Sequence, residues 1–288
     1  MAIENLVFKG GGVLGIAYAG AISALDEENI LEHVTGVAGT SAGSIVAALL
    51  SLRYTAGEIK DILAATNFKN FEDHWDPLRI PMHYGLYKGD FLLGWIKDIV
   101  KKKTGDENST YQDLAKFGSR DLKVFAADLN TSHVKEFSKD TTPSVIVAES
   151  IRASMSIPFY FSAWKFPNDN PDNHVYVDGG TVYNYPINAF NDLNNTIGFF
   201  LFNTHYAVSD LNYHSLEHFV KSLFKTLMKS QDIDFHRNML ENQVTVKIDD
   251  FGISATDFNI TPAMEDKLYK SGFEATKSFL QTRLKKED

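Results

Sequence analysis

Short apolar segments alternate with longer segments of helical periodicity along most of this 288-residue chain. The apolar runs predict strands at residues 3–8, 34–38, 122–127, 175–177, 196–202 and 243–248, and a hairpin partner for the third of these at 133–137. Helical patterns cover residues 15–28, 42–52, 55–65, 90–103, 145–154, 215–242 and 262–284. This alternation favours a three-layer α/β/α fold, in which helices cover both faces of a mostly parallel central sheet.

Composition narrows the classes of function. With 44% hydrophobic residues the chain can bury a sizeable core, and we expect one domain over residues 1–288. The formal net charge of −9 argues against a nucleic-acid partner, because such a surface needs clustered Lys and Arg. The absence of cysteine excludes disulfides, thiolate metal sites and thiol catalysis.

The N-terminal residues and the hydropathy pattern bear on localisation. Residues 3–8 already fit a strand and lack the sections of a secretion signal. No stretch approaches the ~20 apolar residues of a membrane-spanning helix. We therefore expect a cytoplasmic protein with peripheral membrane contact as an option, while a secreted effector without a cleaved signal would share these features.

A serine stands in the pentapeptide GTSAG at residues 39–43, between a predicted strand and a predicted helix. At such a turn the serine adopts a strained backbone conformation that presents its hydroxyl, and small neighbours let the strand and the helix pass closely. Ser41 is therefore a candidate nucleophile. In the alternative interpretation, Ser41 or Ser44 only caps the helix.

Three consecutive glycines, Gly10, Gly11 and Gly12, separate the first predicted strand from the first predicted helix. Their backbone N–H groups would face an anion, which makes them candidate oxyanion donors. The alternative is a phosphate-binding loop, since Gly10, Gly12 and Gly15 fit G-x-G-x-x-G. No Lys-Ser/Thr pair follows, however, and the acidic residue at the expected distance, Glu32, precedes its strand instead of ending it.

A base is needed because a serine hydroxyl is a poor nucleophile until its proton is removed. Asp178 ends a short predicted strand and precedes two glycines, so it is a candidate, although Asp-Gly is also a common turn pair. The other candidate is a histidine, and His205 is the best placed of the nine. It follows Asp178 so closely that the usual order of strand, acid, helix and histidine would be cramped.

Three motifs in this order resemble the patatin-like phospholipases: GGGVLG at residues 10–15, GTSAG at 39–43 and DGG at 178–180. Residues 85–90, 152–158 and 184–187 are also similar to segments of that family. The resemblance covers about residues 3–202 and leaves about 203–288 as a C-terminal extension. It implies the patatin-like fold and a serine hydrolase that acts on carboxylic esters.

The resemblance also implies a mechanism. Ser41 would attack the ester carbonyl of a glycerophospholipid or related lipid, and Asp178 would accept its proton without an intervening histidine. Gly10, Gly11 and Gly12 would bind the oxyanion, and water activated by Asp178 would hydrolyse the acyl-enzyme. Asp178 must be ionised yet basic, which partial burial would reconcile by raising its pKa. This dyad requires no metal or cofactor.

Two observations concern the substrate. Many bacterial relatives carry Arg or Lys where this chain has Leu14, which bears on rate or substrate preference more than on reaction type. Segment 67–87 and the run Phe159, Phe161, Trp164 and Phe166 are rich in aromatic residues and are candidates for an interfacial acyl channel and lid. Ordinary core packing is the alternative for both. The sequence leaves room for a protein activator.

Two other functions remain open at this point. One is a soluble α/β-hydrolase esterase with a Ser41, Asp178 and His205 triad. The other is a dormant hydrolase site on a module that binds a lipid or a protein partner.

Overall fold

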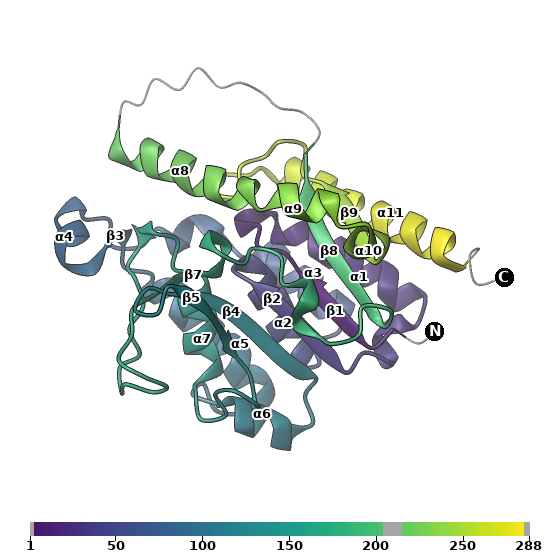
Figure 1. Cartoon of the computed structure of the whole chain (residues 1–288), viewed down its shortest axis with the longest axis horizontal. Coiled ribbons are helices and arrows are strands. Elements are labelled where there is room, and N and C mark those ends of the chain that lie inside the picture. The colour runs from purple at the N-terminus through teal and green to yellow at the C-terminus, as the bar shows by residue number, and fades with distance from the viewer. Residues whose placement is uncertain (1–2, 204–214, 285–288) are drawn as a thin grey trace.

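A central sheet of seven strands organises the molecule, and the computed structural model describes residues 3–203 and 215–284 (Figure 1). Six strands follow the order β5 (His133–Phe137), β4 (Asp121–Asp128), β2 (Gly36–Thr40), β1 (Asn5–Phe8), β8 (Thr196–Phe202) and β9 (Thr245–Asp249). All neighbours from β4 to β9 are parallel, whereas β5 and the seventh strand, β7 (Tyr176–Asp178), are antiparallel to β4. The mostly parallel sheet expected from the sequence is therefore confirmed.

Helices flank this sheet, as the alternating pattern predicted. They comprise α1 (Ile16–Glu27), α2 (Ala42–Ser51), α3 (Ala56–Ala65), α4 (Ile80–His83), α5 (Asp90–Thr104), α6 (Tyr111–Phe117), α7 (Val147–Ser154), α8 (Leu216–Ser230), α9 (Asp232–Arg237), α10 (Met239–Gln243) and α11 (Pro262–Leu284). On one face, Leu6 and Phe8 of β1 belong to the main core with side chains of α1, α2, α7 and α11. On the opposite face, Val7 packs with Ala38, Phe125 and Ile187. Both faces are thus covered.

Several sequence expectations need correction. Residues 215–242 form three helices instead of one. The break between α9 and α10 lies at Asn238, which has an extended backbone and whose side chain accepts the Glu241 N–H at the start of α10. The sequence analysis also missed α6, a short helix that begins with a capping box formed by Thr110 and Asp113. The expected helix at 55–65 is present as α3, and it begins with a capping box formed by Thr55 and Glu58.

The aromatic segment 67–87 is not uniformly irregular. It holds two short 3₁₀ turns, α4 and the strand β3 (Gly85–Tyr87), which pairs with β6 (Phe159–Phe161). Phe68, Phe71 and Tyr87 are buried in the core, whereas Trp75, Leu78 and Met82 are exposed. The second aromatic run is divided too, since Phe161 and Phe166 are buried and Phe159 is exposed. Core packing therefore accounts for part of each segment.

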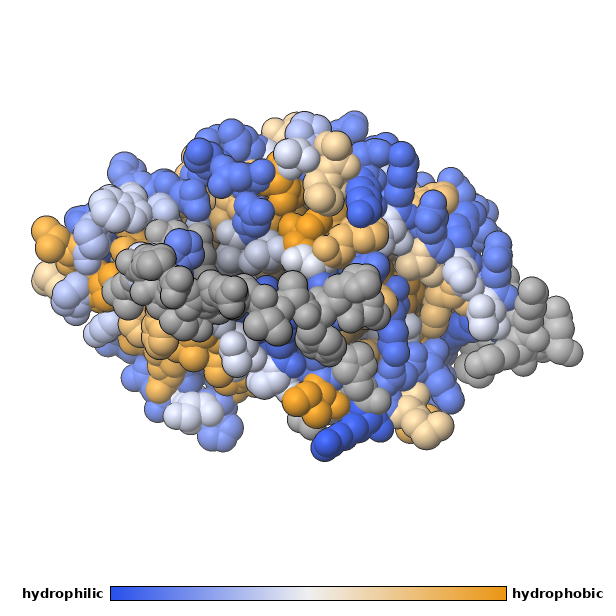
Figure 2. Space-filling model, turned by 90° about the horizontal axis from the view of Figure 1, so that it is seen from above, coloured by the Kyte–Doolittle hydropathy of each residue, from blue (hydrophilic) through white to orange (hydrophobic). Residues whose placement is uncertain are grey.

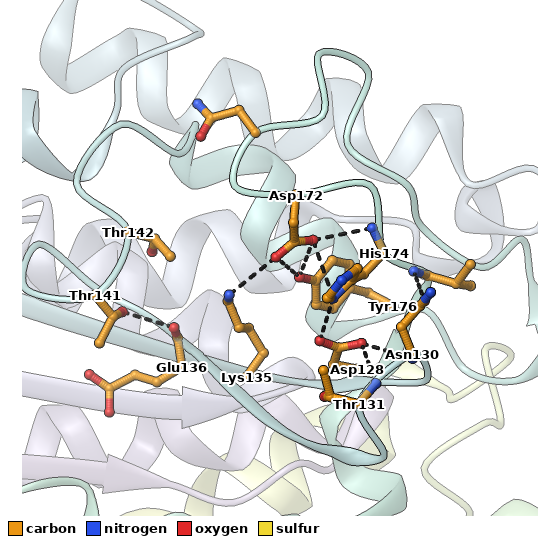
Figure 3. A network of polar contacts seen from close by, with 12 residues as sticks. Asp128, Asn130, Thr131, Lys135, Glu136, Thr141, Thr142, Asp172, His174 and Tyr176 are labelled. Atoms are coloured by element: carbon orange, nitrogen blue, oxygen red, sulfur yellow. Dashed lines mark hydrogen bonds and ion pairs between the residues drawn. The ribbon is translucent and has the colours of Figure 1, made fainter.

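A polar network fastens β7 to β4 (Figure 3). His174 shares a 2.8 Å hydrogen bond with Asp128, and Asp172 accepts from the Tyr176 hydroxyl and from Lys135. Burial raises the pKa of Asp128, but hydrogen bonds from His174 and two backbone N–H groups outweigh it and leave the pKa below its ordinary value. The network connects the start of β7 with β4 and β5.

Among the helices of the described ranges, none has the length and apolar character that a membrane span requires.

Candidate active site

Ser41 lies at the sharp turn between β2 and α2, as expected. Its backbone has φ 52° and ψ −128°, a left-handed conformation that is strained for a residue with a side chain. The turn needs small neighbours, since a Cβ at Gly43 would lie 2.4 Å from the Phe8 carbonyl oxygen. Although Ser41 occupies the N-cap position of α2, its side chain makes no capping hydrogen bond, and the Ser44 hydroxyl donates to the Ser41 carbonyl at 2.6 Å. The capping alternative therefore does not describe what the Ser41 hydroxyl does.

Ser154 fixes the strained turn from the other side. Its hydroxyl oxygen accepts the Ser41 N–H at 2.8 Å and donates its own proton to the Phe125 carbonyl at 2.6 Å. Ser154 is the last residue of α7 and is completely buried. Arg152 in turn anchors the end of this helix through hydrogen bonds to three backbone carbonyls and to Ser156. The nucleophile candidate is thus held by a chain of contacts that begins in α7.

Asp178 reaches Ser41 because β4 has two successive neighbours along the same edge. The parallel strand β2 pairs with β4 as far as Thr40 opposite Phe125. The antiparallel strand β7 then takes over, with Asp178 opposite Ala126. The tips of β2 and β7 therefore meet, and the next residue must be small: a Cβ at Gly179 would lie 2.4 Å from the Phe125 carbonyl oxygen.

The two side chains are in direct contact. The Ser41 hydroxyl donates to Oδ2 of Asp178 at 2.7 Å, and the Gly180 N–H donates to Oδ1 at 2.7 Å. Asp178 is fully buried, and burial raises its pKa from an ordinary 3.8 to about 7, an effect that the two hydrogen bonds only partly oppose. A carboxyl group of this pKa can take up and return a proton near neutral pH.

The glycine loop (residues 10–12) lies next to this pair. The Gly10 N–H already donates to the Asn184 carbonyl at 2.9 Å. Among the described residues, the N–H groups of Gly11 and Gly12 have no hydrogen-bond partner. Of the three glycines selected from the sequence, these two therefore have N–H groups available to a ligand.

A cavity of about 150 Å³ adjoins the glycine loop. Gly10, Gly11, Leu14 and Asn184 line one side, and Phe224 and Met228 of α8 are among the residues on the other. Leu14 contributes apolar surface to this cavity. Ser41 and Asp178 do not line this cavity, and Ser41 is only 3% exposed.

The junction between α8 and α9 fastens the cavity wall to the site. The Gln231 side chain accepts the Asn184 N–H at 2.8 Å and donates to the Gly180 carbonyl at 2.7 Å. One residue on, Asp232 forms a 2.7 Å ion pair with the buried Lys9, which precedes the glycine loop. Burial lowers the pKa of Lys9, and the attraction of Asp232 opposes this effect. Residues C-terminal to the three motifs therefore complete the site.

Sequence reasoning missed Ser154, Asn184 and Gln231. The first two lie in segments that were recognised as similar to the family, but no local pattern says what their side chains touch. His205, the alternative base, lies outside the described residues. Within the described part of the chain, no cluster of three or more His, Asp or Glu residues is arranged to hold a metal ion.

Comparison with known proteins identifies the family of this chain. The family model described as patatin-like phospholipase matches residues 6–191. The uncharacterised protein YqhO of Bacillus subtilis is 32% identical, with 96% of this chain and 97% of YqhO covered. The probable lipid hydrolase 463L of invertebrate iridescent virus 6 is 24% identical, with 64% and 62% covered.

Among solved structures, VipD from Legionella pneumophila superposes with a TM-score of 0.72 at 16% identity, covering 98% of this chain and 67% of VipD. That likeness concerns the fold, a mostly parallel sheet flanked by helices. The family match extends over well more than half of the residues and includes the glycine loop, the Ser41 turn and Asp178. The chain belongs to the patatin-like phospholipase family.

Proposed function

We propose that this protein is a lipid acyl hydrolase of phospholipase A type, which cleaves carboxylic esters of glycerophospholipids or related lipids through a dyad of Ser41 and Asp178. The observation that carries the proposal is the direct 2.7 Å hydrogen bond from the Ser41 hydroxyl to Asp178, made at a strained turn beside a loop with free N–H groups. Nucleophile, base and oxyanion donors are the three parts that acyl transfer needs.

In the first step Ser41 Oγ forms a bond to the ester carbonyl carbon while its proton passes to Oδ2 of Asp178. The π electron pair of the carbonyl moves to its oxygen, which the N–H groups of Gly11 and Gly12 stabilise. When the tetrahedral intermediate collapses, the bond to the alcohol oxygen breaks. The proton on Asp178 goes to that oxygen, so a lysolipid leaves and an acyl-enzyme remains.

The second step returns the enzyme to its starting state. Asp178 accepts a proton from water, and the resulting hydroxide equivalent attacks the acyl carbon. The Ser41–acyl bond breaks, Ser41 recovers its proton from Asp178, and a fatty acid is released. In each of the two steps Asp178 acts first as a base and then as an acid. This suits a carboxyl group whose pKa lies at about 7.

The direct contact favours a dyad over a triad. In a triad the imidazole stands between serine and carboxylate, and the carboxylate never touches the serine hydroxyl. Here the two oxygens of Asp178 accept from Ser41 and from the Gly180 N–H. We therefore infer that no histidine takes part in the proton transfer.

Two surfaces support a lipid substrate. The cavity beside the glycine loop has apolar walls formed in part by Leu14, Phe224 and Met228, as an acyl chain requires. On the exterior of α8, a stripe of Phe219, Leu223 and Leu227 is 40–49% exposed. Figure 2 looks onto the face that carries α8 and shows hydrophobic and hydrophilic residues next to each other. We infer that this face contacts the membrane peripherally.

The proposal is tested by incubating the purified protein with mixed phospholipid vesicles and measuring released fatty acid and lysolipid. A fluorophosphonate probe should label Ser41 in the same preparation. His205→Ala decides between dyad and triad: we expect activity within about threefold of wild type, whereas loss of a triad histidine costs on the order of 10³-fold or more. If wild type neither releases fatty acid nor reacts with the probe, the site is dormant and a binding function is favoured.

The pH dependence provides a separate prediction. Asp178 must be ionised to accept the Ser41 proton, and its pKa is about 7. We therefore expect kcat/KM to rise about tenfold per pH unit below pH 7 and to level off above it. The measurement is a pH series with a soluble p-nitrophenyl ester. A midpoint near 4, the ordinary range of a carboxyl group, would contradict the raised pKa.

A further inference from the structure

The side chain of Asn184 is buried and has no hydrogen-bond partner in the part of the chain that the structure describes. Asn184 is 1% exposed, and neither its Oδ1 nor its Nδ2 has a hydrogen bond among the described residues. Its backbone is fully engaged, with the N–H donating to Gln231 and the carbonyl accepting from Gly10. Most buried side-chain amides are hydrogen-bonded, because leaving them unpaired costs stability. The exception calls for a ligand that pairs with this amide.

The amide lies between the reactive groups of the candidate site. A Cβ added at Gly10 would be 2.3 Å from Oδ1 of Asn184 and 3.3 Å from Cβ of Ser41. A Cβ added at Gly180 would be 3.0 Å from the same Oδ1 and 2.9 Å from Oδ1 of Asp178. Asn184 also lines the cavity together with Gly10 and Gly11. The unpaired amide is thus next to the nucleophile, the base and the glycine loop.

Charge and hydrogen-bonding capacity indicate what the amide would bind. The developing negative charge in ester hydrolysis resides on the carbonyl oxygen, and it requires donors. Within the described residues, the glycine loop has two N–H groups without a partner, since the third, that of Gly10, is already used by the Asn184 carbonyl. A neutral amide supplies a further donor and leaves the net charge beside Asp178 unchanged.

We propose that Nδ2 of Asn184 donates a hydrogen bond to the ester oxygen that becomes the oxyanion, and so completes the donor set begun by Gly11 and Gly12. The inference rests on the proposed lipid acyl hydrolase function and adds a substrate-contacting residue to it. As Ser41 Oγ bonds to the carbonyl carbon, the π pair moves to this oxygen and the Ser41 proton goes to Asp178. The free-energy cost of burying the amide is offset only when this oxygen accepts its hydrogen bond.

Two substitutions test the proposal. Asn184→Ala removes the amide, and Asn184→Leu removes it while keeping a similar volume; both retain the two backbone hydrogen bonds. For a p-nitrophenyl ester we expect kcat to fall about 10²- to 10³-fold with a small change in KM, the usual effect of losing one oxyanion donor. The thermal midpoint of Asn184→Leu should equal or exceed that of wild type, because an unpaired polar group has been removed.

A trifluoromethyl ketone distinguishes oxyanion binding from a purely structural contribution. Such a ketone adds to Ser41 as a tetrahedral oxyanion, so its affinity should weaken by the same factor as kcat/KM in both variants. The matched control is Asn188→Ala, which removes an exposed asparagine amide of the same loop that bonds Glu241 and should leave both quantities unchanged.

Retention of kcat and of ketone affinity within threefold of wild type by either folded variant would overturn the inference while leaving the proposed function intact. A loss of activity with unchanged ketone affinity would also overturn it. Failure of the proposed function is recognised separately, since wild type itself would then release no fatty acid and resist the fluorophosphonate probe.

Discussion

Asp178→Asn is expected to lower kcat/KM for ester hydrolysis by about 10⁴-fold or more, because the variant keeps the shape of the site but has no base for the Ser41 proton. Ser41→Ala should be equally inactive, since it removes the atom that bonds to the substrate. The two losses should not add in the double variant, because both residues act in one step. The measurements are release of fatty acid from vesicles and turnover of a p-nitrophenyl ester.

The same Asp178→Asn variant should gain stability at alkaline pH. The pKa of Asp178 is raised from 3.8 to about 7 by burial, so folding takes up a proton between these values. Wild type therefore loses stability as the pH rises above 4, and the loss is complete above 7. An amide stays neutral throughout, so we expect a higher thermal midpoint than wild type at pH 8 and similar midpoints below pH 4.

The matched control is Asp140→Asn, which neutralises an exposed carboxylate that is not part of the candidate site. It should change neither activity nor the pH dependence of stability beyond about 0.5 kcal/mol. An Asp178→Asn protein that hydrolyses lipid esters at more than a hundredth of the wild-type rate would refute the dyad.

Arg152→Met is expected to destabilise the fold by about 2–4 kcal/mol. The guanidinium is 1% exposed and donates to the carbonyls of Lys88, Gly89 and Ser162 as well as to Ser156. Methionine fills similar space but leaves carbonyl groups unpaired, each at about 1–3 kcal/mol. Burial also penalises the charge and lowers the pKa of Arg152 to about 10, and relief of that penalty offsets part of the loss.

Urea denaturation followed by circular dichroism measures this effect. Lys116→Met is the control, since the Lys116 side chain is 67% exposed and its pair with Asp113 is a surface contact. We also expect the folded fraction of Arg152→Met to be less active, because Arg152 anchors the helix whose last residue, Ser154, holds the Ser41 N–H. A shift of less than about 0.5 kcal/mol would mean that the orphaned carbonyls find other partners.

The sequence was sufficient for the fold class and for the serine turn, since both follow from local patterns. Alternating apolar and helical segments predicted the parallel sheet, and GTSAG marked the strained turn at Ser41. The contact between Ser41 and Asp178 does not follow from a local sequence pattern. It depends on β7 pairing antiparallel to β4 where β2 ends, and no spacing along the chain encodes that arrangement; the family resemblance supplied the pairing of these residues instead.

Residues that act through tertiary contacts escaped sequence reasoning for the same reason. Ser154 and Gln231 matter because of what their side chains reach, more than a hundred positions away in one case and about fifty in the other. The break between α9 and α10 had a local signal, the pair Asn238 and Glu241, but a continuous apolar periodicity masked it. Asn184 could not be selected from the sequence, because what distinguishes it is a buried side-chain amide that has no hydrogen-bond partner among the described residues.

β4 positions the ends of the two strands that lead to Ser41 and Asp178. Thr40 and Asp178 pair with Phe125 and Ala126, two consecutive residues of β4, so this strand holds the end of β7 next to the turn that carries Ser41. The loops and helices that shape the cavity can therefore lengthen, shorten or change composition without moving the two groups apart. The proposed nucleophile and base would then keep their separation while the residues around the cavity change.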